Sequence, residues 1–158
     1  MQKITTYLWF DNQAEEAATF YSSLFADSRI LEVQRYGEAG PGPAGTAMTV
    51  SFELSGQRFV ALNGGPEFTF TEAISLYVDC ETQEEVDELW ARLTADGGQE
   101  SQCGWLKDRW GLSWQIIPRQ LPELLGHPDP AKAQQVMKAM LGMHKIDLQA
   151  LREAAGSA

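Results

Sequence analysis

The sequence contains few cysteines, few basic residues and no long apolar run. Its 158 residues include only two cysteines, Cys80 and Cys103, and 12 Lys and Arg against 22 Asp and Glu, for a formal net charge of −10. Two cysteines outside a CxxC motif exclude a disulfide framework, and we expect them to be reduced, buried thiols. Because no clustered basic face is present, we expect no nucleic-acid partner and no docking on anionic lipid.

Membrane insertion and secretion are also unsupported by the sequence. No apolar segment approaches the ~20 residues that cross a bilayer. The first residues, MQKITTYLWFDN, lack the apolar region and small-residue cleavage site of a signal peptide. We therefore expect a cytoplasmic protein with no membrane partner. A hydrophobic content of 44% is ordinary for a globular chain, and this length suits one domain with a real core.

Residue patterns predict the order strand, helix and three strands in the first part of the chain. The strand ITTYLWF (4–10) is β-branched and aromatic, and Asp11 or Asn12 then caps a helix. The apolar stripe of this helix consists of Ala14, Ala17, Ala18, Tyr21, Leu24 and Phe25. The three strands are predicted at 28–36, 47–54 and 57–63, with a flexible loop, GEAGPGPAG, at 37–45 and a hairpin turn at Ser55-Gly56.

The same order is predicted a second time. A strand at 73–79 precedes a helix that Thr82 and Glu85 begin as a capping box and that Gly97-Gly98 end. The apolar positions of this helix are Val86, Leu89, Trp90 and Leu93. A short strand near 99–103 and the hairpin CGWLKDRWGLSWQIIP (103–118) complete the round, with the turn at 109–111.

An internal repeat relates the two rounds and predicts the fold. Leu8 and Asp11 lie sixty-eight positions before Leu76 and Asp79. We predict an α+β fold in which two βαβββ modules form a partly open barrel, within a single domain. Module one covers 1–63, a linker 64–72, module two 73–118 and a C-terminal helical tail 119–158. In the tail Asp129-Pro130 begins a helix, 147–155 form a second one, and the predicted apolar face is Val136, Met137, Met140 and Leu141.

Strand alternation sorts the side chains into a helix-covered face and an open face. On the open faces we expect Tyr7, Trp9, Ser75, Tyr77, Ser113 and Gln115. Trp114 is expected in the core, and Trp105 and Trp110 at the cavity or its rim. Aromatic surface with a few hydrogen-bonding groups is typical of a small-molecule site. The candidate ligand-binding residues are Tyr7, Trp9, Asn63, Ser75, Tyr77, Cys103, Trp105, Trp110 and Gln115.

Several of these residues have alternative interpretations. Asn63, before Gly64-Gly65, either contacts a ligand or belongs to a turn that needs positive φ. The large aromatic residues of the open faces either contact a ligand or fill the barrel. Cys103 faces the side of Trp105 if the strand alternates regularly. For the run from Lys107 to Arg109 we favour a solvated turn over an acid–base set.

The paired modules resemble the vicinal oxygen chelate superfamily of glyoxalase and bleomycin-resistance proteins. Within it, YLWFDNQAEEAATFYSSLF, FVALNGGPEF and CGWLKDRWGLSWQIIP resemble the PhnB-like family, often labelled demethylubiquinone methyltransferase, over roughly residues 1–145. The label implies S-adenosylmethionine, which usually binds at a Gly-rich loop after a first strand. Here the first strand runs into DNQAEEA, which has no glycine.

The resemblance also implies a divalent metal held by His and Glu from the first and last strands of each module. The matching positions in this chain are Thr5, Ala73 and Gln115, with Ala61 or Asn63 as the fourth. Methyl groups cannot ligate a metal, and hydroxyl and amide oxygens are weak donors for zinc, nickel or iron. The two histidines, His127 and His144, lie in the tail. We expect no metal site and no cofactor.

The leading functional hypothesis is metal-independent binding of a small, partly aromatic molecule in the barrel cavity, for sequestration or sensing, by a homodimer. The alternative is an enzyme of the same superfamily, with Asn63, Gln115, Cys103 or Asp108 as its polar groups. A third hypothesis is a dimeric interaction module with a filled interior.

Overall fold

The structure is a computed structural model that describes residues 2–156, and it divides into two compact units between Thr69 and Phe70. The first contains β1 (Thr6–Phe10), α1 (Ala14–Ser22), β2 (Arg29–Arg35), β3 (Ala47–Leu54) and β4 (Gln57–Asn63). The second contains β5 (Ser75–Cys80), α2 (Gln83–Thr94), a short 3₁₀ turn, η1 (Ala95–Gly97), β6 (Gln99–Glu100), β7 (Trp105–Lys107), β8 (Ser113–Pro118), α3 (Gln120–Leu125), α4 (Pro130–Leu141) and α5 (Leu148–Ala154).

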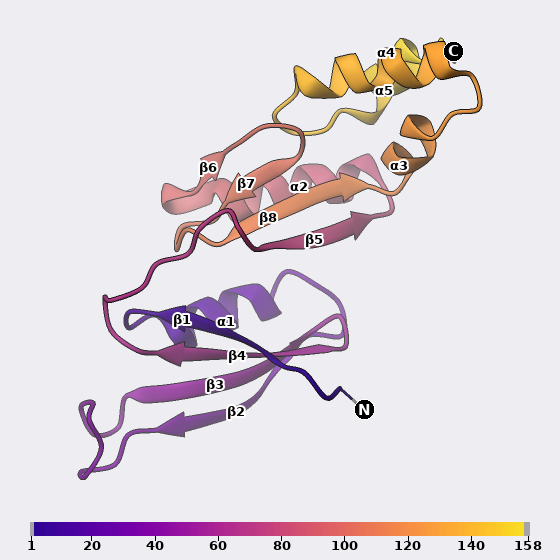
Figure 1. Cartoon of the computed structure of the whole chain (residues 1–158). Helices are drawn as coiled ribbons and strands as arrows, with labels where there is room; N and C mark the ends of the chain where they lie inside the picture. The colour runs from indigo at the N-terminus through magenta and orange to yellow at the C-terminus, as the bar shows by residue number, and fades with distance from the viewer. Residues whose placement is uncertain (1, 157–158) are drawn as a thin grey trace. The chain divides into compact units, whose positions relative to one another are not determined.

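The two sheets have the same topology, which confirms the predicted βαβββ repeat (Figure 1). The strand order is β1-β4-β3-β2 in the first unit and β5-β8-β7-β6 in the second. In each sheet the first strand pairs in parallel with the last, and the remaining pairs are antiparallel. Among the described residues these are two separate four-stranded sheets, and no strand of one sheet pairs with a strand of the other.

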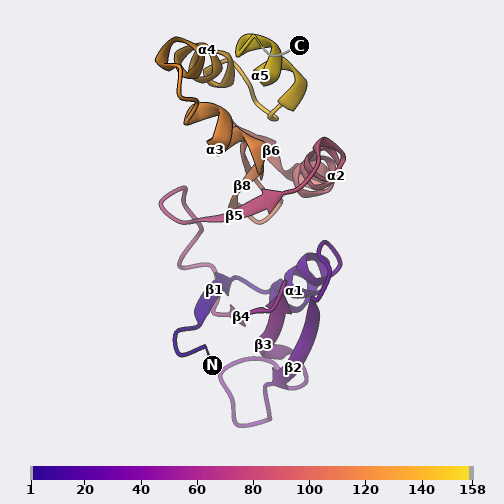
Figure 2. The same cartoon turned by 90° about the vertical axis from the view of Figure 1, so that its right-hand side faces the viewer.

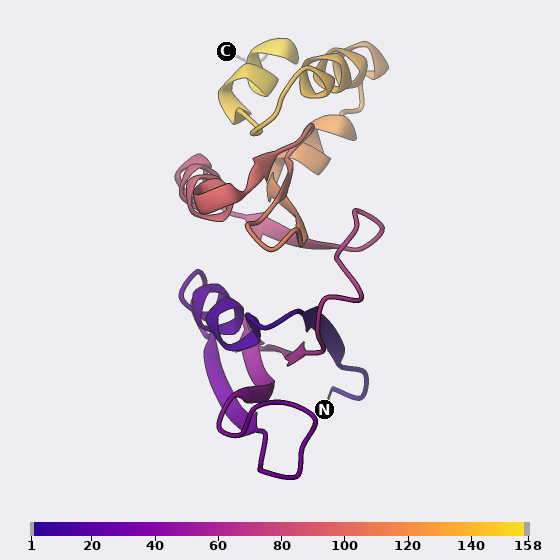
Figure 3. The same ribbon diagram turned by 90° about the vertical axis from the view of Figure 1, so that its left-hand side faces the viewer.

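Local sequence signals set several element boundaries correctly. Strands β3 and β4 have the predicted bounds, and the turn between them places Ser55 at φ 48° and Gly56 at φ 83°. Two successive positive φ values characterise the type I′ turn, whose twist matches that of the strands it joins. The connection between β2 and β3 is a wide loop without helix or strand, as its glycines and prolines predict (Figure 3).

Helix α1 packs its small residues against the first sheet (Figure 1). Four of the predicted apolar positions are fully buried: Ala14, Ala17, Ala18 and Tyr21. The predicted cap was wrong, because the N-cap is Gln13 and its side chain makes no capping hydrogen bond. The Oδ1 atom of Asn63 instead accepts the Ala14 N–H at 2.9 Å. A side chain from the end of β4 therefore satisfies a helix donor that a local residue usually satisfies.

Helix α2 follows its sequence signals closely. The Glu85 N–H donates to the Thr82 hydroxyl at 3.1 Å, and the Glu85 carboxylate accepts the Glu81 N–H at 3.0 Å. The first bond is the predicted cap, worth about 1 kcal/mol. The predicted apolar positions are all buried, namely Val86, Leu89, Trp90 and Leu93. Helix α2 itself lies along one face of the second sheet (Figure 2).

The C-terminal helices belong to the second unit and pack beyond the end of β8 (Figure 2). Their core joins Ile117 of β8 to Leu121, Val136, Ile146, Leu151 and Ala155. Helix α3 was not predicted. The predicted apolar face of α4 was partly wrong, since Met137 is 37% and Leu141 59% exposed. None of the helices in the described part of the chain is long and apolar enough to span a membrane.

Side-chain and backbone hydrogen bonds fasten the tail to the rest of this unit. The Gln83 amide donates to the Ile146 carbonyl and accepts the Leu148 N–H, both at 2.8 Å. An ion pair of 2.9 Å joins Lys145 to Asp87. The N–H groups of residues 103 and 104 donate to the carbonyls of residues 143 and 144. These contacts make the tail an integral layer of the second unit rather than a loose appendage.

Candidate functional site

Each sheet has one face covered by a helix and one open face, and the burial of β1 follows this division. Leu8 and Phe10 are 4% and 2% exposed on the side of α1. Tyr7 is 61% exposed and Trp9 is half-buried on the opposite side. The register places Tyr7 beside Val60 and Trp9 beside Leu62 of β4. The open face of the first unit is thus aromatic at its β1 edge and apolar beside it.

The indole of Trp9 is held by the NGGPEF segment. Its Nε1–H donates to the Gly65 carbonyl at 2.9 Å, and its ring meets the Phe68 ring edge-on with centroids 4.8 Å apart. Gly65 has a φ of 94°, so this turn does use positive φ. Gly65 therefore has the conformational role that one of the two sequence interpretations gave to this turn, and both glycines contact Trp9, a candidate binding residue.

The open face of the second unit carries a row of candidate residues across three strands. Gln115 of β8 lies in register with Tyr77 of β5 on one side and with Trp105 of β7 on the other. Tyr77 is 54% exposed, and the other two are half-buried. An amide between two aromatic side chains offers both ring surface and hydrogen bonds, as small-molecule sites commonly do.

Gln115 is oriented by its neighbour on β5. Its Nε2 donates to the Ser75 hydroxyl at 2.9 Å, which leaves Oε1 directed elsewhere. No donor among the described residues occupies that oxygen. Burial raises the pKa of Tyr77, and Asp79 and Cys80 add to this shift, so the phenol stays protonated at neutral pH. The row can therefore accept one hydrogen bond at Gln115 and donate one at Tyr77.

The hairpin 105–118 is braced by a buried carboxylate. Asp108 is only 2% exposed, and its Oδ1 accepts the N–H groups of Trp110 and Leu112 at 2.9 and 3.1 Å. Its Oδ2 accepts the indole N–H of Trp114 at 2.9 Å. The favoured interpretation of a solvated turn was therefore wrong at Asp108. Trp114 is 1% exposed, in the core where it was predicted.

The neighbours of Asp108 are also engaged in ion pairs. Lys107 pairs with Glu72, and Arg109 pairs with Asp96 at 3.4 Å. The Arg109 guanidinium also lies over the half-buried Trp110 ring, 5.2 Å from its centroid. Trp110 is thus fixed at the turn by its neighbours, and the arrangement is a structural one rather than an acid–base set.

The two cysteines differ in their surroundings. Cys80 is fully buried, and burial raises the pKa of its thiol to about 12, with Glu85 contributing. Cys103 is half-buried and has a φ of 57°, followed by Gly104 at 85°. Because β7 begins only at Trp105, regular alternation does not extend to Cys103, and that argument for its orientation was wrong. A neutral, buried thiol is unreactive, which fits the prediction for Cys80.

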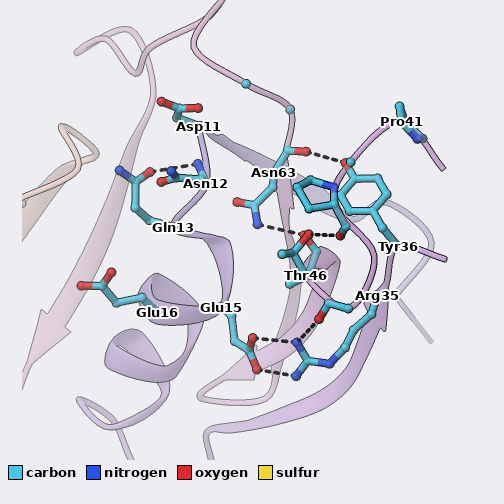
Figure 4. A pocket seen from close by; sticks show the side chains of 16 residues that line it. Asp11, Asn12, Gln13, Glu15, Glu16, Arg35, Tyr36, Pro41, Thr46 and Asn63 are labelled. Atoms are coloured by element: carbon cyan, nitrogen blue, oxygen red, sulfur yellow. Dashed lines mark hydrogen bonds and ion pairs between the residues drawn. The ribbon is translucent and has the colours of Figure 1, made fainter. Parts of the chain in front are cut away.

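Asn63 lies on the helix side of its sheet, in register with Phe10. Besides capping α1, its amide donates to the Ala47 carbonyl at 3.0 Å, and its own carbonyl accepts the Tyr36 hydroxyl at 3.1 Å. These bonds tie together α1, β3 and the loop after β2. Figure 4 shows the hydrogen bond between Asn63 and Tyr36. Both ends of the side-chain amide that we expected to meet a ligand are therefore used within the unit.

A hollow of about 1070 Å³ opens beside Asn63, between the start of α1 and the 36–46 loop (Figure 4). Its lining carries three carboxylates, Asp11, Glu15 and Glu16, against one guanidinium. That guanidinium, of Arg35, pairs with both Glu15 oxygens at 3.1 and 2.9 Å, and the pair raises the pKa of Arg35. An acidic lining is a poor site for an anion. We did not predict this hollow from the sequence. The glycine- and proline-rich loop was the sequence feature that could have indicated it.

The residues at the superfamily's metal positions do not form a metal-binding set. Ala61 is fully buried and Ala73 exposed, and Thr5 and Gln115 offer neutral oxygens. Within residues 2–156 no three His, Cys, Asp or Glu side chains are grouped as a metal would require. His144 Nδ1 lies 2.8 Å from the Ser101 carbonyl, and His127 Nδ1 accepts the Asp129 N–H at 2.9 Å. Both histidines therefore have local structural partners.

A family model decides the classification of the chain. The model of the 3-demethylubiquinone-9 3-methyltransferase family matches residues 2–117, which is most of the sequence. The chain belongs to this family. The resemblance to the PhnB-like family noted in the sequence is thereby confirmed, and the two βαβββ units have the fold that this resemblance implies. No curated protein matches the chain.

Solved structures agree with the family assignment. The chain is 43% identical to a putative 3-demethylubiquinone-9 3-methyltransferase, PhnB protein, from Bacillus cereus, covering 74% of this chain and 99% of that one with a TM-score of 0.69. It is 19% identical to protein PA1353 from Pseudomonas aeruginosa, covering 75% and 98%, with a TM-score of 0.61. The second likeness concerns the fold alone. The family model ends before α3, so the matched region contains both βαβββ units and lacks the helical tail.

Proposed function

We propose that this family member binds a small, partly aromatic molecule on its open sheet faces, without a divalent metal. One observation carries the proposal: each open face presents an exposed tyrosine together with a half-buried tryptophan. These are Tyr7 and Trp9 in the first unit, and Tyr77 and Trp105 in the second. Because all four rings lie within strands and not at loop tips, these neighbouring aromatic side chains indicate a contact surface.

The energetics favour an aromatic ligand over an aliphatic or charged one. Covering ring surface that is now exposed stabilises a complex by about 25 cal/mol per Å² of apolar area. An offset or edge-to-face ring contact adds roughly 0.5–1.5 kcal/mol. The free Oε1 of Gln115 and the protonated phenol of Tyr77 would orient a ligand through one donor and one acceptor.

The absence of a metal from the proposal rests on side-chain chemistry. The positions at which the resemblance to the superfamily implies metal ligands hold Thr5, Ala73 and Gln115. None of these residues supplies an imidazole or a carboxylate. The methyl transfer named in the family description is not proposed for this chain. Strand β1 runs into α1 through Asp11, Asn12 and Gln13 with no glycine, whereas a nucleotide-like methyl donor usually needs a Gly-rich turn there.

A thermal-shift screen tests the proposal. Protein is stripped of metal with a chelator, and the chelator is then removed by dialysis. The protein is heated with a panel of phenols, quinones and aromatic carboxylates, and in parallel with Mn²⁺, Zn²⁺, Ni²⁺ and Fe²⁺. We expect at least one organic compound to raise Tm by mass action. That shift should fall in Tyr77→Ala and Trp105→Ala and persist in Leu141→Ala, which removes an exposed apolar side chain from α4. Stabilisation by a metal, with none by any organic compound, contradicts the proposal.

The role we infer is sequestration or sensing rather than turnover. Gln115→Ala separates the two possibilities once a ligand is known. If the protein is a binder, this change weakens affinity through the lost hydrogen bond, by roughly 0.5–1.5 kcal/mol. If it is an enzyme that uses Gln115, product formation is abolished while most of the affinity remains.

We also infer that the protein acts as a homodimer. Each sheet ends in edge strands, among them β1 and β5, which carry the exposed tyrosines Tyr7 and Tyr77. Exposed edges need a partner strand or a covering element. Analytical ultracentrifugation tests this directly: a mass of two chains at micromolar concentration supports it, and a single-chain mass contradicts it.

A further inference from the structure

Gly64 leaves the space that the Trp9 indole occupies. A Cβ atom built on Gly64 would lie 2.3, 2.4 and 2.6 Å from the indole atoms Cζ2, Cε2 and Cη2 of Trp9. Real non-bonded carbon contacts are 3.5–4.0 Å. The Trp9 ring therefore lies directly on the backbone of Gly64, the residue that follows β4, and any side chain at position 64 would have to displace the ring.

The indole cannot move aside without losing a hydrogen bond. Its Nε1–H is bound to the Gly65 carbonyl at 2.9 Å, on the residue next to Gly64. The indole also meets the Phe68 ring, at an interplanar angle of 79°. Backbone N–H groups continue the β1–β4 pairing past the strand ends, from Gly64 to Phe10 and from Gly65 to Asp11. The surface under the indole is therefore fixed by the sheet itself.

We propose that Gly64 is a positioning residue for ligand binding, which fixes Trp9 as a rigid wall that recognises flat aromatic rings. The inference rests on the proposed function and adds a ligand class for the first unit. Since the indole N–H is already bonded to Gly65, Trp9 presents only ring carbons on the open face. Leu62, in register with Trp9 on β4, is apolar as well, and so is Val60, which is in register with Tyr7. This face therefore selects planar, apolar ring surface, and it makes no hydrogen bond through Trp9.

Gly64 can be tested cleanly because its backbone is ordinary. It is not among the glycines with positive φ, so an alanine is conformationally permitted there. The effect of Gly64→Ala therefore passes through the Trp9 ring. Gly37→Ala is the matched control, since its φ is also not positive and an added Cβ would meet no atom within 4 Å. Trp9→Phe removes the indole atoms that meet the added methyl group.

The experiment follows indole N–H signals by ¹H–¹⁵N NMR in the full chain. The Trp9 signal is the one missing in Trp9→Phe. We expect it to exchange slowly with solvent in wild type and in Gly37→Ala, and at least tenfold faster in Gly64→Ala. The probes are 2-naphthol and its saturated analogue decahydro-2-naphthol, which has the same hydroxyl group but no flat ring. We expect Gly64→Ala to weaken naphthol binding roughly tenfold and to leave the weak decahydronaphthol binding unchanged.

A double-mutant comparison excludes a merely structural effect. In the Trp9→Phe background, adding Gly64→Ala should change neither Tm nor naphthol affinity, because the atoms it would displace are gone. Equal naphthol affinity in wild type and Gly64→Ala, with the Trp9 signal unmoved, overturns the positioning role while the proposed function stands. If naphthol shifts no signal in wild type and the wider aromatic panel also fails to bind, the proposed function fails and this inference with it.

Discussion

The carboxylate of Asp108 gives the sharpest prediction about stability. It accepts N–H groups from Trp110, Leu112 and Trp114, and the side chains of the last two are each 1% exposed. A hydrogen bond to a charged group contributes about 1.5–3 kcal/mol, and a buried donor left unpaired costs about 1–3 kcal/mol. Asp108→Ala leaves three donors without this acceptor. We expect it to lower the free energy of unfolding by about 4 kcal/mol and Tm by about 10 °C.

Asp108→Asn refines the test because it keeps the shape of the side chain. One oxygen can still accept the two backbone N–H groups, but the new NH₂ group faces the Trp114 indole N–H, so two donors meet. We expect a loss of about 2 kcal/mol. Urea unfolding followed by near-UV circular dichroism measures it. Asp96→Asn is the control, since its carboxylate is 74% exposed and its pair with Arg109 is a surface one. Equal stability of the two Asn variants would refute the bracing role.

Two further predictions concern the second unit. Gln83→Ala should lower the free energy of unfolding by about 1–3 kcal/mol, because the glutamine amide joins α2 to Ile146 and Leu148 at the start of α5. Amide hydrogen exchange should become faster in α5 than in the other helices of the unit. An equal increase throughout the unit would argue against this role of Gln83. Cys80 should not react with a disulfide reagent in the native protein at pH 8–9, while Cys103 reacts first. Because burial raises the pKa of Cys80 to about 12, the native state retains a proton that the unfolded state loses, so the free energy of unfolding should fall as pH rises from about 9 to about 12. The matching Cys80→Ala variant should show a weaker fall over that range.

Elements with local signals were predictable from the sequence. Ser55-Gly56 fixed the hairpin between β3 and β4, and Thr82 with Glu85 fixed the start of α2. Alternation placed Tyr7 and Tyr77 on the open faces, where they are exposed. These features depend on residues within a turn or two of each other, so short-range chemistry decides them.

The features that the sequence did not reveal depend on distant residues. The cap of α1 comes from Asn63, forty-nine positions after the Ala14 whose N–H it accepts. In the sequence Asp108 looks like part of a charged turn. In the structure it is buried, where it accepts hydrogen bonds from later residues of the hairpin. The apolar stripe of α4 was misplaced because Val136 faces the tail core while Leu141, five residues later, faces solvent. Such choices are made by tertiary packing, and no local pattern encodes them.

The candidate site was predicted unevenly for the same reason. The register of β5, β8 and β7 brings Tyr77, Gln115 and Trp105 into one row, as strand parity suggested. Cys103 was misjudged because two consecutive positive φ values interrupt the alternation before β7. The hollow beside Asn63 arises where a loop, a helix start and a strand end meet, and that meeting depends on the whole unit.

Native mass spectrometry of the freshly purified protein shows whether it carries a small organic molecule or a divalent metal ion. The spectrum would be recorded before and after dialysis against a chelator, with elemental analysis of the same samples for divalent metals. We expect the added mass of a small organic compound, which survives the chelator and is lost in Tyr77→Ala, and no divalent ion in proportion to the protein. A divalent ion bound in a one-to-one ratio, together with no organic adduct, would contradict the account.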